Sequence, residues 1–375
     1  MKIKILLLTL CLASLTCCSQ PKPSQDDKLK EEIGEMLLVG FRGTELTDDC
    51  HIVRDIRDYH IGGVILFEYD APSKSRPRNI NSRQQLKKLC GDLQALTDET
   101  LLISIDQEGG MVSRLKEKYG FPTFASAQKT AQQGDDSVRY YANLTAKTLN
   151  DLGINLNFAP CVDVNVNPTC PIIGKLERSF GNNAKKVSRC AKIWIDEQQK
   201  NGVTACLKHF PGHGSSKSDT HLGLADVSDT WKELELEPYK TLIKNSDVRM
   251  VMTTHVFNAR IDSLYPATLS KPTLTGLLRD SLHFRGVIIT DDLAMGAMTD
   301  QYGYEEIVKR AILAGADMLC LSNNGKDYNA DVVPQTVELI YNMVKKGDIP
   351  AERIKQSANR IRQLKSKVSI VNGEL

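Results

Sequence analysis

The sequence predicts an α/β fold and, within that class, a single (β/α)8 TIM-type barrel. Eight short apolar runs alternate along the chain with longer amphipathic stretches, and polar turns separate them. Strands that alternate with helices predict parallel pairing through helical crossovers, and eight repeats are the number that closes a barrel. A length of 375 residues suits one such barrel, with an open doubly wound sheet as the alternative.

The apolar runs are short and end at polar turns, which is typical of buried strands. In chain order they are Met36–Phe41, Gly63–Phe67, Leu101–Asp106, Ile154–Pro160, Val203–His209, Met250–His255, Val287–Asp291 and Met318–Ser322. The stretches with helical spacing are Ser82–Leu96, Ser137–Leu152, Ala184–Lys200, Trp231–Lys244, Tyr304–Ala314 and Val337–Lys346. After the last strand we expect only closing helices and no second folded domain.

The composition is that of an ordinary globular protein. Apolar residues make up 41% of the chain and charged residues 25%, which permits a sizeable core. The 48 basic and 46 acidic residues leave a net charge of +2, so the chain has no bulk attraction for polyanions. We therefore expect no nucleic-acid partner.

The first residues have the features of an export signal. Lys2 and Lys4 precede an apolar run from Ile5 to Leu15, which is too short to span a bilayer. The run ends in Leu15-Thr16-Cys17-Cys18, which resembles the lipobox of bacterial lipoproteins, where the cysteine after the cut is acylated. Cys18 fits that position better than Cys17, because a leucine stands three places before it.

These features predict how the amino terminus is organised. We expect residues 1–18 to be a lipoprotein-type signal peptide with acylation at Cys18, and residues 19–28, rich in Pro, Gln and Asp, to be a flexible tether. Acylation would attach the protein to a membrane of the cell envelope without a spanning helix. A cleaved signal peptide with incidental cysteines is the alternative interpretation.

The cysteines beyond the export segment do not indicate a disulfide framework. Seven remain, an odd number, and they show no CxxC pair or zinc-ligand spacing. Cys206 and Cys320 lie in predicted strands, so we expect buried thiols there. Cys161 and Cys170 are close enough in sequence to be candidates for one bridge across a loop.

Ionisable residues stand at the ends of four predicted strands: Asp106, His209, His255 and Asp291. One such residue is often a helix cap or a solvated turn. Four on separate strands gather on one face of a barrel, and barrel enzymes hold their active sites on that face. This placement favours a catalytic site at the carboxyl ends of the strands.

Two arrangements admit a metal interpretation, and both are weak. Asp291 and Asp292 are adjacent, but neighbouring residues on a strand point to opposite sides and do not easily serve one centre. We expect one of them to act at the barrel mouth and the other to support it. His209 and His213 have the spacing of zinc ligands on a helix, but Pro211 and the neighbouring glycines make a helix improbable there.

A polar, glycine-rich segment continues from the fifth predicted strand. It reads Lys208-His209-Phe210-Pro211-Gly212-His213-Gly214, with Asp219-Thr220-His221 close behind. Such a loop directly after a strand indicates chemistry rather than packing. Asp219 can accept the ring N–H of His221 and raise its basicity, which suits a proton-transfer residue. Spacing alone is also compatible with a simple loop hydrogen bond.

This segment resembles the signature of bacterial exo-β-N-acetylglucosaminidases of glycoside hydrolase family 3. The likeness extends in the family's order through Ile105–Gly110, Glu177–Gly181, Met252–His255, Pro266–Ser270 and Thr290–Ala297, and it covers about residues 29–345. It implies a (β/α)8 catalytic domain over residues 29–375 that removes terminal β-linked N-acetylglucosamine with retention of configuration. It implies a glycan as partner, and neither a metal nor an organic cofactor.

The resemblance also implies a role for each candidate residue. Asp291 falls on the nucleophile, His221 on the acid/base and Asp219 on the aspartate that partners the histidine. The sugar-binding positions fall on Asp106, Arg114, Arg178, Lys208 and His209. Met111 departs from the pattern, because many relatives have arginine there, and this bears on fine specificity.

Two alternatives stay open. Some members of the family pass the glycosyl group to phosphate rather than to water, so phosphorolysis of the same linkage is one. The other is a lipid-anchored glycan-binding barrel that has lost turnover. The presence of Asp291, Asp219 and His221 argues against this second alternative.

Overall fold

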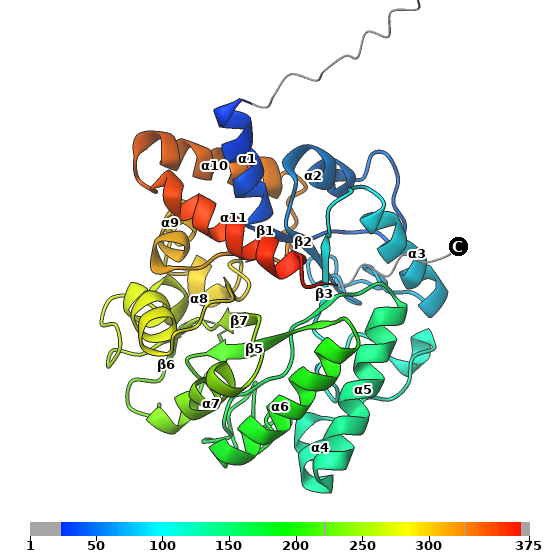
Figure 1. Ribbon diagram of the computed structural model, residues 1–375, viewed down its shortest axis with the longest axis vertical. Helices are drawn as coiled ribbons and strands as arrows, with labels where there is room; N and C mark the ends of the chain where they lie inside the picture. Colours follow the sequence, from blue (N-terminus) through cyan, green and yellow to red (C-terminus); the bar gives the residue numbers. More distant parts are fainter. Residues whose placement is uncertain (1–23, 221–222, 326, 369–375) are drawn as a thin grey trace, which may run out of the picture.

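Eight parallel strands form the centre of the computed structural model, which describes residues 24–220, 223–325 and 327–368 (Figure 1). The strands are β1 (Leu37–Gly40), β2 (Gly63–Leu66), β3 (Leu102–Ile105), β4 (Leu156–Asn157), β5 (Thr204–Phe210), β7 (Met250–Thr253), β9 (Val287–Ile289) and β10 (Leu319–Leu321). They pair in the order β10-β1-β2-β3-β4-β5-β7-β9. A parallel bridge between Ile289 and Met318 joins β9 to β10, so the sheet closes. The predicted barrel is confirmed, and the open sheet is wrong.

Helices surround the strands on the outside of the barrel. They are α2 (His51–Tyr59), α3 (Arg83–Gln94), α4 (Ala127–Gln133), α5 (Asp135–Asp151), α6 (Ala184–Lys200), α7 (Glu237–Asn245), a π-helix at Pro272–Ser281, α8 (Gly296–Thr299), α9 (Tyr304–Ala314) and α10 (Val332–Lys346). Two further helices, α1 (Gln25–Glu35) and α11 (Ala351–Lys365), begin and end the described chain. A short parallel pair, β6 (Ala225–Asp226) with β8 (Val256–Phe257), lies outside the barrel sheet.

The predicted helices over residues 184–200 and 304–314 match α6 and α9 to the residue. The stretch predicted over 231–244 divides into a 3-10 turn at Glu233–Leu236 and α7, because Pro238 stands in the first turn of a new helix. The last predicted helix begins five residues earlier, at Val332. Pro334 fits there because first-turn N–H groups have no intrahelical partner.

The amino-terminal helix α1 begins inside the segment predicted as a tether. Ser24 caps it: the Asp27 N–H donates to Ser24 Oγ at 3.1 Å, and the Asp27 carboxylate accepts from the Ser24 N–H at 3.0 Å. Residues 25–28 are therefore helical, and the tether predicted over 19–28 is wrong for them. Cys18 and the signal lie outside the described residues. No helix within those residues has the length and apolar character needed to cross a membrane.

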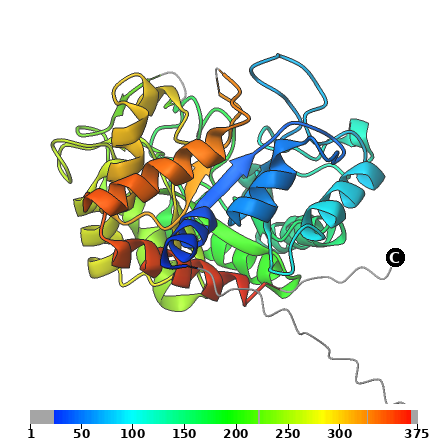
Figure 2. The ribbon, with the colours of Figure 1, turned by 90° about the horizontal axis from the view of Figure 1, so that it is seen from above.

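The amino ends of the strands are covered by α1 and α11, which lie together along the lower side of Figure 2. Arg362 on α11 pairs with Glu35 at 2.7 Å, directly before β1. Arg353 on the same helix donates to the carbonyl oxygen of Ala316 at 2.7 Å, just before β10. The two helices thus close one end of the barrel and leave the carboxyl ends of the strands for a site.

A buried ion cluster fixes α11 to this end. The Asp317 carboxylate is fully buried and contacts the guanidinium groups of Arg279, Arg353 (3.3 Å) and Arg360 (3.0 Å). It also accepts the Ile288 N–H at 2.9 Å. One carboxylate therefore connects the β10 entrance, α11, the π-helix and β9.

Asp317→Ala is expected to lower the free energy of unfolding by about 3–5 kcal/mol, because it leaves buried arginines without their counter-ion. Urea denaturation followed by circular dichroism measures the loss. The control is Asp348→Ala, which removes a partly exposed partner of Lys309 and should change stability by less than about 0.5 kcal/mol. Equal stability of the two variants would contradict a structural role for the cluster.

Candidate active site

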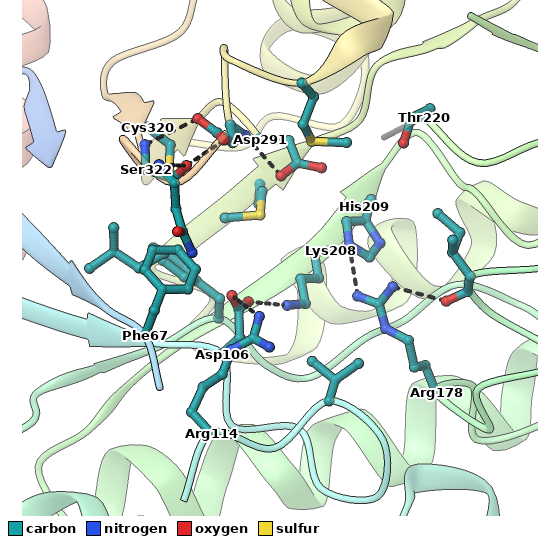
Figure 3. A pocket seen from close by; sticks show the side chains of 18 of the residues that line it. Phe67, Asp106, Arg114, Arg178, Lys208, His209, Thr220, Asp291, Cys320 and Ser322 are labelled. Carbon is teal, nitrogen blue, oxygen red and sulfur yellow. Dashed lines mark hydrogen bonds and ion pairs between the residues drawn. The ribbon is translucent and has the colours of Figure 1, made fainter. Parts of the chain in front are cut away.

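A cavity of about 540 Å³ opens at the carboxyl ends of the strands (Figure 3). Its lining includes residues that lie within or after the carboxyl halves of the barrel strands: Phe67, Asp106, Phe158, Lys208, His209, Met252, Asp291 and Cys320. A parallel barrel brings these strand ends together whatever their separation in the chain. The prediction that strand-end ionisable residues gather on one face is confirmed for Asp106, His209 and Asp291.

His255 is different, although it also follows a strand. It is fully buried and does not line the cavity. Its Nδ1 lies 2.8 Å from the hydroxyl of Thr268, and its Nε2 lies 2.9 Å from the carbonyl oxygen of Asp292. His255 therefore lies just beyond the carboxyl end of β7, as predicted, but it supports the backbone beside Asp291 and does not face the cavity.

The floor of the cavity is an ion network built on Lys208. The Lys208 ammonium lies 2.7 Å from Asp106 and 2.7 Å from Glu108. Arg114 contacts the other oxygen of Asp106 at 3.2 Å, and Arg178 holds both oxygens of Glu108 at 2.8 and 2.9 Å. Figure 3 shows Asp106, Arg114, Arg178 and Lys208 facing the same space.

The network keeps its members ionised despite their burial. Burial would raise the pKa of Asp106, but the charges of Lys208 and Arg114 outweigh it and hold that pKa below its usual value. Burial likewise opposes ionisation of Glu108, yet Arg178 and Lys208 lower its pKa to about 2. Burial would lower the pKa of Lys208, and the two carboxylates raise it instead. The floor thus presents fixed charges.

Lys208 and His209 both line the cavity although they are adjacent in β5. Successive residues of a regular strand point to opposite faces. The pairing of β5 with β7 shifts register between Leu207 and Phe210, and such a bulge turns neighbouring side chains to one side. This irregularity explains how one strand supplies two site residues.

His209 is held by an acid that sequence reasoning missed. Its Nδ1 lies 2.6 Å from Asp163, which also accepts the His213 N–H at 2.8 Å. Its Nε2 lies 3.1 Å from Arg178, and an arginine can only donate, so Nε2 accepts and Nδ1 carries the proton. Asp163 lies six residues after β4 and its partner His209 is 46 residues away, so no local signal in the sequence marks it.

One possible ligand atom from each of Cys161, Asp163 and His209 lies within 4.8 Å of the other two, as in a metal site. The set does not suit a cation. Both nitrogens of His209 are engaged, one of them by the positively charged Arg178. Burial raises the pKa of the Cys161 thiol well above its usual value, whereas a metal needs the thiolate.

The cysteines behave partly as expected. Cys206 and Cys320 are buried, as predicted for thiols inside strands. Cys161 and Cys170 are both free thiols and pack with Ile172 and Ile173, so the bridge considered for them is not formed.

Asp291 follows β9 and lines the cavity, and its neighbour Asp292 has separate partners. The Asp291 N–H donates to Thr253 Oγ1 at 3.3 Å, and the Asp292 N–H donates to an Asp291 carboxylate oxygen at 2.9 Å. The Asp292 carboxylate accepts the N–H of Ser322 at 3.1 Å and also its hydroxyl. Burial raises the pKa of Asp292 even so. The two acids therefore have distinct environments, with Asp292 tied to β10.

Asp219 and Thr220 line the same cavity. The carbonyl oxygen of Thr220 accepts the N–H of Ala297 at 3.2 Å, which ties this loop to the segment after Asp291. His213 Nε2 lies 3.3 Å from the Thr220 hydroxyl. His221 lies outside the described residues, so its predicted role stays a prediction. The other seven candidate site residues all line this one cavity.

The model of the glycosyl hydrolase family 3 N-terminal domain matches residues 28–364. Among curated relatives, Beta-hexosaminidase A of Pseudoalteromonas piscicida is 32% identical, over 90% of this chain and 60% of that protein. Beta-hexosaminidase of Tolumonas auensis is 33% identical, over 77% of this chain and 83% of that protein. The chain therefore spans less than two thirds of the first relative's length.

Solved structures of glycoside hydrolase family 3 members also resemble this chain. A glycoside hydrolase family 3 β-N-acetylglucosaminidase from Paenibacillus sp. str. FPU-7 superimposes with a TM-score of 0.82 at 34% identity, covering 92% of this chain and 64% of that one. A family 3 glycosyl hydrolase from Mycobacterium smegmatis superimposes with a TM-score of 0.75 at 28% identity, covering 89% of this chain and 96% of that one.

Proposed function

Since this chain belongs to glycosyl hydrolase family 3, we propose that it is a retaining exo-glycosidase that removes terminal β-linked N-acetylglucosamine from glycans. The single observation that carries the proposal is the position of Asp291 in one cavity with the Asp106–Lys208–Arg178 network and the Asp219 loop. Relatives named as beta-hexosaminidases and a β-N-acetylglucosaminidase support the choice of sugar.

The chemistry divides between a nucleophile and a proton carrier. Asp291 attacks the anomeric carbon, the bond to the leaving oxygen breaks, and His221 gives that oxygen its proton. A water molecule then attacks the glycosyl-aspartate while His221 takes its proton, which releases the sugar and regenerates Asp291. Asp219 orients the imidazole and stabilises its protonated form.

The floor network orients the terminal sugar. Asp106 accepts hydrogen bonds from sugar hydroxyls, and Lys208, Arg114 and Arg178 donate them. Because His209 Nε2 already accepts from Arg178, His209 also fixes the guanidinium plane. Groups held in place before the sugar arrives place the anomeric carbon against Asp291 at little entropic cost.

An assay with an aryl β-N-acetylglucosaminide, followed by proton NMR, tests the proposal. Early appearance of free β-N-acetylglucosamine supports retaining hydrolysis. N-acetylglucosamine 1-phosphate formed only in phosphate buffer would instead show phosphorolysis. Binding without any product would show a non-catalytic barrel and overturn the proposal.

The fixed charges of the floor predict a pH-independent affinity for the product. The pKa values of Asp106 and Glu108 lie below their usual range and that of Lys208 lies above it, so all three stay ionised from about pH 5 to about pH 9. We expect the inhibition constant of free N-acetylglucosamine to be flat across this window. In contrast, kcat/KM should fall at high pH, because protonation of the leaving oxygen needs a general acid in its protonated form. An inhibition constant that follows the kcat/KM profile would contradict this account.

We also propose that the protein is a lipoprotein of the cell envelope, acylated at Cys18. The charged start, the apolar run and the Leu15–Cys18 segment support this location. Mass spectrometry of the mature amino terminus should find a lipid-modified cysteine, and an unprocessed Met1 would rule the proposal out.

A further inference from the structure

The loop after β2, residues 67–79, forms one wall of the cavity through Tyr69 and Arg76. The loop is a short hairpin closed by backbone hydrogen bonds between Asp70 and Ser75 at 2.9 and 3.2 Å. The Asn324 side chain, from the segment after β10, accepts the N–H of Ala71 at 2.9 Å and donates to the carbonyl oxygen of Tyr69 at 3.1 Å. The hairpin is therefore braced from a distant part of the chain.

A second set of contacts braces the base of this hairpin. The Asp70 carboxylate accepts two hydrogen bonds from Arg42, one from Nε and one from a terminal nitrogen, each at 2.9 Å. It also pairs with the fully buried side chain of Arg78, which donates to the carbonyl oxygen of Asn323 at 3.0 Å. The hairpin and the β10 loop are thus held together as one rigid unit.

Three cations beside the hairpin share one carboxylate. Glu68 is only 4% exposed and contacts Arg76 at 3.4 Å, the Lys116 ammonium, and Lys118 at 3.6 Å. The hydroxyl of Tyr119 also donates to it at 3.2 Å. Three positive charges against one negative charge leave an excess of two positive charges.

Two of these cations face the cavity. Arg76 and Lys116 line it together with Tyr69, and their side chains are 46% and 41% exposed. The Arg76 guanidinium lies 4.8 Å from the centre of the Tyr69 ring, and this stacking orients its plane. The floor does not neutralise them, because Asp106 and Glu108 are already paired with Lys208, Arg114 and Arg178.

From this geometry we propose that the rim formed by Glu68, Tyr69, Arg76 and Lys116 binds a carboxylate on the unit linked to the terminal sugar. The inference rests on the proposed function and adds the class of the neighbouring unit. A neutral sugar hydroxyl does not need the positive charge that these cations carry in excess of Glu68. A planar carboxylate matches the fork of Arg76, and Lys116 adds a second charged donor. Glu68 holds both donors at the cavity wall before the substrate binds.

Two matched disaccharides test the inference. One is the methyl glycoside of N-acetylglucosaminyl-β-(1→4)-glucuronic acid, and the other is its uncharged methyl ester. For the wild-type protein we expect a KM about tenfold lower for the acid, with similar kcat. One charge-assisted hydrogen bond typically increases affinity by about tenfold. The preference should shrink at high salt, since the rim cations are partly exposed.

Substitutions at the rim test whether its cations cause the preference for the acid over the ester. Arg76→Gln/Lys116→Gln should bring the ratio of the two KM values to about one, mainly by raising the KM for the acid. The control is Arg83→Gln/Lys87→Gln, which removes an arginine and a lysine that share Asp151 on the surface and do not line the cavity. This control should keep the full preference. Glu68→Gln should increase the preference, because the cations then lose their counter-ion.

The outcomes are distinct. Equal KM values for acid and ester in the wild type, or a preference that survives in Arg76→Gln/Lys116→Gln, would overturn the inference. Faster turnover of both disaccharides with added inorganic phosphate, without discrimination between them, would assign the rim to phosphate instead and also overturn it. If neither disaccharide is cleaved, the proposed function fails. Calorimetric binding of the acid and the ester to the same variants then decides the inference separately.

Discussion

Asp291→Asn is expected to lower kcat/KM by about 10⁴-fold or more for every substrate, whatever its leaving group. An amide has the shape of the carboxylate and can still accept the Asp292 N–H, which lies 2.9 Å from Asp291 in the wild type. It cannot donate an electron pair to the anomeric carbon as a carboxylate does, so the glycosyl-enzyme does not form. Steady-state rates with an aryl glycoside and with a disaccharide measure the loss.

The control for this variant is Asp300→Asn, an exposed aspartate at the end of α8. It should keep both the activity and the stability of the wild type. Thermal unfolding of Asp291→Asn should also match the wild type, because the backbone contacts around Asp291 are unchanged. A loss of less than tenfold, or a loss confined to poor leaving groups, would move the nucleophile to another residue.

His221→Ala should fail in a different way. For substrates whose leaving groups depart without a proton, the glycosyl-enzyme should still form, and its hydrolysis should become slow. A burst of product followed by slow turnover is the expected time course, visible by rapid mixing. For ordinary glycans the loss should be about 10²–10⁴-fold, the usual effect of general acid–base catalysis.

Azide separates this variant from Asp291→Asn, because it attacks a glycosyl-enzyme without needing a general base. Added azide should restore His221→Ala in part, with glycosyl azide as the product, and should leave Asp291→Asn inactive. Asp219→Ala should resemble a milder His221→Ala, since the imidazole remains but loses its orienting partner. An equal loss for all leaving groups in His221→Ala, without rescue by azide, would assign proton transfer elsewhere.

The barrel was predictable because each strand is an apolar run that ends at a polar turn. The boundaries were less so. The strand predicted over 154–160 contains only two residues of regular pairing, because the Ala159 N–H turns back to the carbonyl oxygen of Asn157 at 2.8 Å. The pair β6–β8 has two residues in each strand, too few for any alternation to show in the sequence. Ser24 and Asp27 are a readable capping box that the tether prediction overlooked.

The site was predictable to the extent that its residues end strands or belong to a recognisable motif. Asp106 and Asp291 are of the first kind. Arg178 lies in the long segment between β4 and α6, and only the family resemblance placed it. The roles of Glu108 and Asp163 depend on partners 70 and 46 residues away, so nothing in the local sequence marks them. The rim needs Asn324, 253 residues from Ala71, and its pairing appears only in three dimensions.

The position of α1 sets the orientation in which a tethered enzyme would work. The helix starts beside the end of α10, where Lys345 pairs with Asp26 at 3.1 Å, and it closes the barrel end opposite the cavity. Six residues lie between Cys18 and Gln25, and the seven steps from one to the other span at most about 25 Å when fully extended. An acyl chain at Cys18 would therefore hold the closed end near the lipid and turn the mouth outward. Such an enzyme would trim chain ends that arrive from the aqueous side, and glycans lying flat against its own membrane would be out of range.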